Sequence, residues 1–262
     1  MQKYWHIFTM TITKQLSYRI NFILGRFSNL IILLLLYSVW VAIGKTGSFG
    51  GMTTTELISY IAFMHIIRAF VFGSFSTLPA EEINEGTFSI YLVKPLNHVI
   101  SCYIRDLADR TVLTTSALTE LWLVHKITGI SFFKTVSPSF FMSGLALLFA
   151  AHILYFVVSY SLNLLAFWSH EAVGPRFLFN WITQFTSGAY FPLFITPLLF
   201  LIIKFTPFPS FAYYPVLTFL GKIYSTEIWQ HLFVGIFWIL IGICLSFILW
   251  RRGLKRYSGQ GI

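Results

Sequence analysis

Apolar residues gather along this chain in long stretches with few interruptions. Four stretches contain no Asp, Glu, Lys or Arg: 27–44, 135–170, 177–203 and 228–250. Two more, about 57–78 and 107–127, are apolar apart from isolated charges. A helix needs about 20 mostly apolar residues to cross roughly 30 Å of hydrocarbon, and its own hydrogen bonds satisfy the backbone there. We therefore expect an all-α integral membrane protein with six transmembrane helices.

The expected spans cover about 24–43, 56–78, 107–127, 138–168, a fifth beginning at 177, and 228–250. Composition agrees, because 56% of the 262 residues are hydrophobic and 10% are charged. In a soluble domain, roughly a quarter of the residues are charged. The alternating pattern of a membrane β-barrel does not occur.

The formal charge of +9 could indicate a nucleic-acid partner, but the positions of the basic residues argue against one. Twelve Lys and Arg fall on one predicted side of the membrane, five on the other, and Arg68 within it. Basic residues favour the cytoplasmic side. We expect a multi-pass protein in contact with membrane lipid, with both termini in the cytoplasm and no nucleic acid bound.

Residues 1–262 are expected to form one transmembrane permease domain with three special segments. In the first, 1–23, apolar residues recur every four positions from Tyr4 to Ile20 and basic residues occupy other faces. This pattern favours an amphipathic helix in the headgroup plane, and a simple lead-in to the first span is the alternative.

The second special segment, 79–98, is a polar cytoplasmic stretch between spans 2 and 3. The third, 194–221, contains several prolines and is predicted to be a re-entrant hairpin on the outer side. Two complete crossings in this region would put the basic C-terminus outside, against the charge rule.

The common catalytic motifs are missing from the sequence. It contains no phosphate-binding Gly-x-x-x-x-Gly-Lys-Ser/Thr loop, no His-Glu-x-x-His and no Gly-x-Ser-x-Gly. The seven His residues are isolated along the chain, and we expect packing roles for them and no metal site. The two cysteines, Cys102 and Cys244, do not suggest a disulfide framework. We therefore expect no enzyme activity and no cofactor in this chain, which leaves transport, conduction or scaffolding.

Several motifs resemble those of bacterial type-2 ATP-binding-cassette (ABC) exporter permeases, in particular the six-span subfamily of about 260 residues often encoded as permease pairs. The motifs are the acidic-to-Gly segment 81–86, the segment 92–97, Trp168-Ser169, Ser187-Gly188, Pro192-Leu193, Pro197, Pro207 and the terminal run 253–257. The resemblance covers nearly the whole chain. The tail 258–261 departs from it, because the acidic residue expected there is missing.

The resemblance implies a permease subunit in the bacterial cell membrane that forms an export pathway with a second permease, identical or paralogous. Two cytosolic ATPase subunits, which would hold ATP and Mg, would drive it. Residues 81–90 would form the coupling helix, with Ile83 and Phe88 inserted into an ATPase groove and the acidic side chains meeting basic residues. A solvated charged turn is the alternative. The coupling residues are Glu81, Glu82, Ile83, Glu85, Gly86 and Phe88.

Two further sites are predicted, one from a pair of charged residues and one from three residues near a helix break. Arg68 and Glu120 each lie about ten residues from the cytoplasmic end of their spans, so we expect an intramembrane charge pair, either structural or lining the pathway. Ser187, Gly188 and Pro192 combine small residues with a break in the helix. We expect an outer gate there, or simply close helix packing.

Two other classes of function stay open. A secondary transporter or channel without an ATPase partner would need several intramembrane carboxylates or an inverted repeat, and the sequence offers Glu120 and one proline-rich region. A membrane scaffold would lack any ATPase partner. The identity of the substrate is not evident from the sequence.

Overall fold

The computed structural model of the chain describes residues 2–44, 49–72, 77–94, 96–133, 137–169 and 173–257. All regular elements in this part of the chain are helical. Pro95, part of the motif at 92–97, and the tail 258–261, where the chain departs from the family pattern, lie outside the described residues. The elements are α1 (Gln2–Ser17), α2 (Arg19–Gly44), α3 (Thr54–Val71), α4 (Leu78–Asn84), α5 (Ser89–Val93), α6 (His98–Thr128), α7 (Pro138–Asn163), η2 (Leu164–Phe167), α8 (Val173–Thr186), η3 (Leu193–Ile195), α9 (Pro197–Ile203), α10 (Phe208–Phe211), α11 (Tyr213–Phe219) and α12 (Ser225–Arg256).

Local sequence fixes several helix ends. Thr53 and Glu56 form a capping box at the start of α3, with the Thr53 backbone N–H donating to Glu56 Oε2 at 3.0 Å. Asn97 caps α6 through its side-chain oxygen, and Gly129 ends that helix in the left-handed conformation. These caps satisfy backbone groups that have no partner inside the helix.

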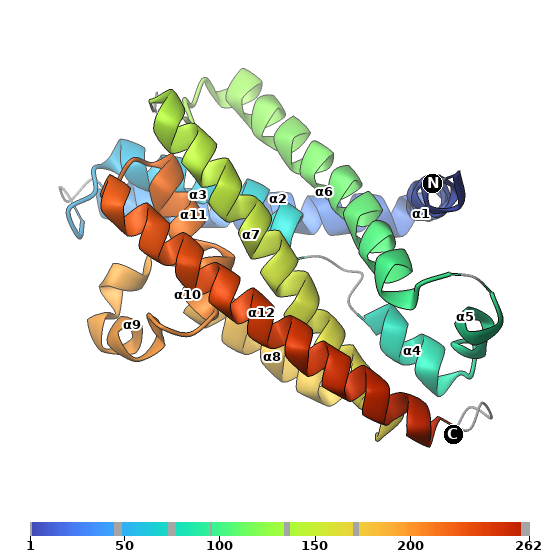
Figure 1. Cartoon of the computed structure of the whole chain (residues 1–262). Coiled ribbons are helices and arrows are strands. Elements are labelled where there is room, and N and C mark those ends of the chain that lie inside the picture. Colours follow the sequence, from blue (N-terminus) through green and yellow to red (C-terminus); the bar gives the residue numbers. More distant parts are fainter. Residues whose placement is uncertain are drawn as a thin grey trace.

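The long helices run back and forth along one bundle (Figure 1). Helix α7 packs along α12, and α3 packs against both α2 and α6. Helix α1 and the last turns of α12 lie at the same end of the bundle as α4 and α5 (Figure 1). The short helices α9, α10 and α11 lie toward the opposite end.

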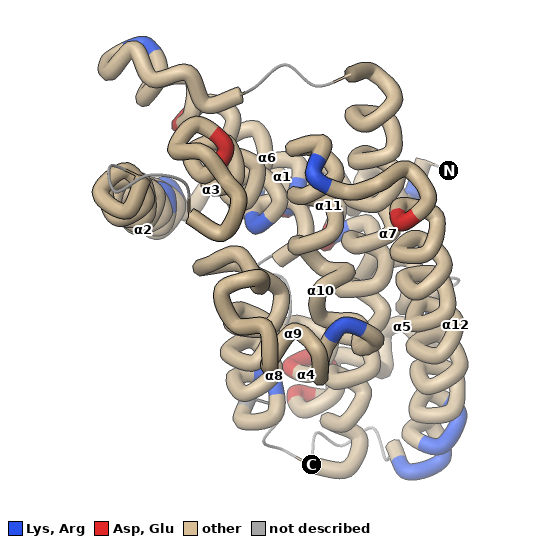
Figure 2. Tube along the Cα trace, turned by 90° about the vertical axis from the view of Figure 1, so that its left-hand side faces the viewer, with Lys and Arg blue, Asp and Glu red and all other residues tan. Residues whose placement is uncertain are grey.

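Four of the described helices are long and apolar enough to cross a membrane: α2, α3, α7 with η2, and α12. In the most apolar 18-residue stretch of α2, and in that of α12, just 11% of the residues are buried inside the chain. Figure 2 shows basic residues at the lower end of α12 and uncharged residues along its middle. These two helices therefore present apolar surfaces to lipid or to another protein.

The other two predicted spans are not confirmed. Helix α6 has 31 residues, about 46 Å at 1.5 Å per residue, but six charged residues along it lower its hydropathy. Helix α8 has 14 residues, about 21 Å, which is less than the hydrocarbon thickness. The chain breaks after α8, and residues 193–219 form four short helices instead of a continuous one. The second predicted span is also shorter than expected, because α3 ends at Val71.

Apolar side chains form two clusters inside the bundle. The larger joins α3, α7 and α11, where Leu57, Leu154 and Val216 are almost completely buried. The smaller lies where α4, η2 and the end of α12 meet, around Phe88 and Phe167. This second cluster fixes the polar segment between α3 and α6 to the bundle.

Candidate functional site

The predicted coupling segment folds into two short helices, α4 and α5, and not into one helix. Pro79 lies in the first turn of α4, where a missing N–H costs little. Gly86 then adopts φ of +77°, a conformation that favours glycine. Its carbonyl accepts a hydrogen bond from the Tyr257 hydroxyl at 2.9 Å. The C-terminal end of α12 thereby holds the turn between α4 and α5.

Ile83 and Phe88 do not project outward as predicted. Their exposed fractions are 1% and 0%. The Phe88 ring packs edge-on against Phe167 of η2, Trp250 of α12 and Tyr257, with ring centroids 5.1 to 5.5 Å apart. The prediction that both side chains enter an ATPase groove is therefore wrong. Large apolar side chains beside short helices are stabilised more by burial in their own chain.

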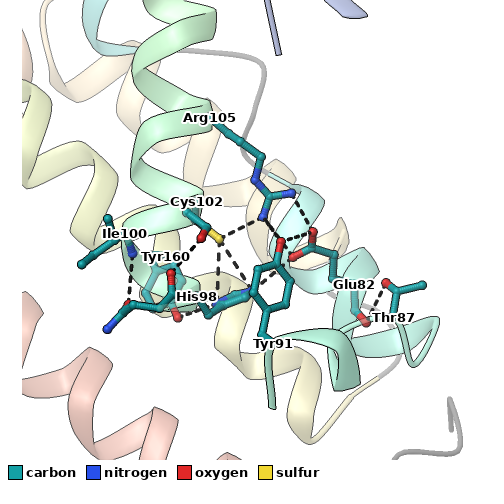
Figure 3. Close-up of polar contacts among 10 residues, drawn as sticks. Glu82, Thr87, Tyr91, His98, Ile100, Cys102, Arg105 and Tyr160 are labelled. Atoms are coloured by element: carbon teal, nitrogen blue, oxygen red, sulfur yellow. Dashed lines mark hydrogen bonds and ion pairs between the residues drawn. The ribbon is translucent and has the colours of Figure 1, made fainter. Parts of the chain in front are cut away.

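Glu82 also faces inward, and it binds residues of α5 and α6 (Figure 3). Its Oε1 atom accepts from Arg105 Nη1 at 2.6 Å, and its Oε2 atom lies 3.2 Å from Arg105 Nη2. Tyr91 donates its hydroxyl to Oε1 at 3.1 Å. The basic partner predicted for Glu82 in an ATPase is thus supplied within this chain by Arg105.

His98, in the first turn of α6, joins Glu82 to α7. Its Nε2 atom lies 3.1 Å from Glu82 Oε2, and its Nδ1 atom lies 2.9 Å from the Tyr160 hydroxyl. A neutral imidazole satisfies both contacts when Nε2 donates to the carboxylate and Nδ1 accepts from the tyrosine. We call Glu82, Tyr91, His98, Arg105 and Tyr160 the anchoring network.

Burial and the neighbouring groups set the charges of the anchoring network. Burial raises the pKa of Glu82, but hydrogen bonds from His98 and Arg105 outweigh it and bring the pKa to about 2. Burial lowers the pKa of His98, although the Glu82 carboxylate opposes this. The network therefore holds an ionised carboxylate, a guanidinium and a neutral imidazole at neutral pH.

Glu82, His98 and Cys102 bring three potential metal-binding atoms within 4.8 Å of one another. The Arg105 guanidinium lies among them, donating to Glu82 and, at 3.4 Å, to Cys102 Sγ. Burial raises the pKa of the Cys102 thiol to about 12, so the sulfur stays protonated. A cation would meet a positive group and a neutral thiol there, so the contacts fit a structural network better than a metal site.

The outer surface of the α4–α5 unit combines acids with apolar side chains. Glu81, Glu85 and Thr87 are exposed. On α5, Ile90, Leu92 and Val93 expose 46%, 55% and 86% of their surface. We call these six residues the outer face. It retains two of the predicted acidic residues and replaces Ile83 and Phe88 with apolar residues of α5.

Arg68 and Glu120 do not form the predicted ion pair. Glu120 Oε2 lies 2.7 Å from His65 Nε2, and Glu120 Oε1 lies 3.5 Å from Arg26 Nη1. Arg68 instead lies over the Tyr190 ring, 5.1 Å from its centroid. Because α3 ends at Val71, Arg68 lies in the last turn of the helix and not ten residues from its end. The depth predicted for Arg68 requires a longer helix.

The predicted gate residues lie at the break after α8. Ser187 is completely buried, and Gly188 adopts φ of +78°. The Gly188 carbonyl accepts from the Tyr60 hydroxyl at 2.6 Å, which ties the break to α3. Pro192 precedes η3. The three residues thus surround one tightly packed turn.

Sequence reasoning missed Tyr91, His98, Tyr160 and Tyr257 as parts of the site. Arg105 binds Glu82, 23 positions earlier in the chain, which no local spacing indicates. One signal was available in the terminal run 253–257. Gly253 leaves room for the Phe167 ring, and Tyr257 reaches the turn at Gly86.

Comparison with known families assigns the chain to a class of membrane protein. The sequence model of the family described as "ABC-2 family transporter protein" matches residues 27–261. The chain belongs to this family of multi-pass membrane permeases, whose members generally partner with ABC ATPase subunits. Comparison with curated proteins and with solved structures gives no match.

Proposed function

We propose that this chain is the membrane-spanning permease subunit of an ABC exporter and receives the force of ATP hydrolysis through the outer face of α4 and α5. Two cytosolic ATPase subunits would dock there, and a second permease, identical or paralogous, would complete the pathway. ATP and Mg²⁺ would be bound in the ATPase subunits.

The observation that supports this proposal most strongly is the attachment of α4 and α5 to three other helices. Glu82 binds Arg105 of α6, His98 connects to Tyr160 of α7, and Phe88 packs against Trp250 of α12. A push on the outer face would therefore move the ends of three long helices together. A loosely attached charged turn could not transmit such a displacement.

The outer face is also chemically suited to a protein partner. It presents two carboxylates beside the exposed apolar side chains of Ile90, Leu92 and Val93. Apolar residues with charged neighbours are typical of surfaces that bind a partner. We place the chain in a bacterial cell membrane. The outer face of α4 and α5 and both chain ends would lie on the cytoplasmic side of that membrane. We also retain 1–23 as an interfacial helix, 194–221 as an outer re-entrant hairpin, and Ser187, Gly188 and Pro192 as an outer gate.

Co-purification tests the proposal directly. The full-length chain, expressed with the ABC ATPase encoded nearest to it, should retain that ATPase through affinity purification. Val93→Asp combined with Leu92→Asp should release the ATPase, because two carboxylates would replace two of the exposed apolar side chains. Val93→Ile is the matched control and should retain it.

Two results would contradict the proposal. The first is an ATPase that stays bound to the double aspartate variant as firmly as to the unaltered chain. The second is labelling of a Cys introduced at Glu85 by an impermeant reagent added outside intact cells, which would put the outer face on the wrong side of the membrane.

A further inference from the structure

A cavity of about 540 Å³, lined by both polar and apolar residues, lies apart from the coupling site, between α1, α2, α3 and α6. Gln184 of α8 also contributes to its wall. Cavities of this size suit the polar group of a small molecule. None of the proposed coupling residues lines it.

Three basic residues from three different helices line this cavity: Lys14, Arg26 and Arg68. Arg26 makes long contacts, at 3.5 Å to Glu120 Oε1 and 3.5 Å to the Leu113 carbonyl oxygen. Arg68 contacts the Tyr190 ring, and no carboxylate forms an ion pair with it among the described residues.

The acidic residues near the cavity do not cancel this charge. Asp109 is the single acid among the lining residues, and Glu120 is shared between Arg26 and His65. Basic groups from α1, α2 and α3 therefore outnumber the acids that face them. A partly buried excess of positive charge attracts an anion.

Amide side chains add hydrogen-bonding capacity to the wall. Gln15 and Gln184 each have a buried side-chain oxygen with no hydrogen bond to another described residue. Asn21 and Asn29 also line the cavity. Amide groups in the wall can pair with the hydroxyl groups of a ligand.

The surface beside the cavity is apolar and unoccupied by the rest of the chain. Ile23, Leu24 and Phe27 of α2 are each about 60% exposed, next to the cavity-lining residues Phe22, Gly25 and Arg26. One stretch of α2 thus contributes polar groups to the cavity and apolar groups to its surroundings.

We propose that this cavity binds the anionic, hydroxyl-bearing phosphate headgroup of an amphiphile whose acyl tail lies along the exposed face of α2. Resting on the proposed function, we assign this class of molecule as the cargo of the exporter. Guanidinium groups recognise phosphate oxygens through paired hydrogen bonds, and the amides pair with hydroxyls. An uncharged apolar compound would leave both sets of groups unsatisfied.

Binding to the purified full-length chain tests the site without any ATPase. Native mass spectrometry in a neutral detergent would compare short-chain phosphatidylglycerol, short-chain phosphatidylcholine and inorganic phosphate. We expect phosphatidylglycerol to bind, and the other two to bind at least about tenfold more weakly. Arg68→Gln should weaken binding of phosphatidylglycerol at least about tenfold, because one hydrogen-bonded ionic contact corresponds to that factor.

Two variants separate recognition from damage to the fold. Lys14→Gln, on the exposed helix α1, should weaken binding about threefold or more without unfolding the bundle, since screened contacts contribute less. Lys126→Gln, an exposed basic residue at the far end of α6, should leave binding unchanged. If neither Arg68→Gln nor Lys14→Gln affects binding, the cavity is not the site.

The remaining outcomes address the nature of the ligand and its role. Equal binding of phosphatidylcholine would overturn anionic selectivity, and equal binding of inorganic phosphate would overturn the requirement for a tail. In the complex with an ATPase, phosphatidylglycerol should stimulate ATP hydrolysis. Binding without stimulation would overturn the cargo role, whereas failure to isolate any such complex would overturn the proposed function and leave the binding result standing.

Discussion

The Oε1 atom of Glu82 lies 2.6 Å from Nη1 of Arg105, and this ion pair connects α4 to α6. Both side chains are 14% exposed, so solvent screens them little. The pair lies between the outer face and a helix that continues through the bundle. It therefore contributes both to local stability and to the mechanical connection that the proposed function requires.

Replacement of Glu82 should loosen α4. We expect Glu82→Gln to lower stability by about 1.5–3 kcal/mol, since hydrogen bonds to a charged group are lost and Arg105 keeps a partly buried charge. Thermal unfolding of the detergent-solubilised chain would measure this. Glu85→Gln, an exposed carboxylate in the same segment, should change stability by less than about 0.5 kcal/mol. Equal effects of the two substitutions would show that the ion pair contributes nothing.

Substitution of Phe88 tests whether its side chain is buried in this chain or inserts into a partner. Phe88→Ala should destabilise the isolated permease by about 3–5 kcal/mol, the usual range for a buried aromatic side chain. Ile90→Ala, at the exposed start of α5, should have little effect on stability and should weaken ATPase binding. A Phe88→Ala variant as stable as the unaltered chain would restore the original prediction that Phe88 enters an ATPase groove.

Acid should release α4 and α5 from the bundle. The pKa of His98 is lower in the folded state than in the unfolded state. As the pH falls below about 6.5, His98 therefore takes up a proton more readily when the segment is unfolded, which favours unfolding. The pKa of Glu82 is also lowered, to about 2, so its contribution is full above about 4.5 and is lost between that pH and about 2. Both effects reduce stability with falling pH.

Hydrogen exchange of residues 78–94 between pH 8 and pH 5, corrected for the intrinsic rate, would follow this change. Protection should fall below pH 6.5, and His98→Asn should remove most of the pH dependence in that range. Constant protection in the unaltered chain would contradict the assignment of a neutral His98.

The charges inside the bundle give a test of coupling. His65→Ala and Glu120→Ala should be strongly non-additive, with a coupling of about 1–2 kcal/mol, because their side chains are 2.7 Å apart. Arg68→Ala and Glu120→Ala should be nearly additive. Unfolding measurements on both double-mutant cycles would decide between this pairing and the Arg68–Glu120 pair expected from the sequence.

The turn after α8 should not tolerate a side chain. Gly188→Ala should destabilise by about 1–2 kcal/mol, because φ is +78° and a Cβ atom would lie 2.8 Å from the Tyr60 hydroxyl oxygen. Gly174→Ala, in α8 with open space around it, is the control and should be neutral or slightly stabilising. Equal stability of the two variants would argue against a tightly packed turn.

The sequence by itself determined that the chain is helical, membrane-spanning and without a motif for nucleotide hydrolysis. Uninterrupted apolar stretches have few alternatives in lipid, so α2, α7 and α12 were predictable in position and extent. The polar segment between α3 and α6 was also predictable as an exception to this pattern. The resemblance to ABC exporter permeases was carried by short motifs in a fixed order, and the family match confirms it.

The tertiary structure decided which side chains meet. Glu82 and Arg105 are 23 positions apart, and Gly86 and Tyr257 are 171 apart, so no local periodicity could pair them. The inward orientation of Ile83 and Phe88 likewise depends on η2 and the end of α12, which approach α4 from distant parts of the chain. Arg68 and Glu120 shared a predicted depth, but pairing also requires a shared direction around each helix axis. Packing of neighbouring helices sets that direction, and the sequence of one helix does not encode it.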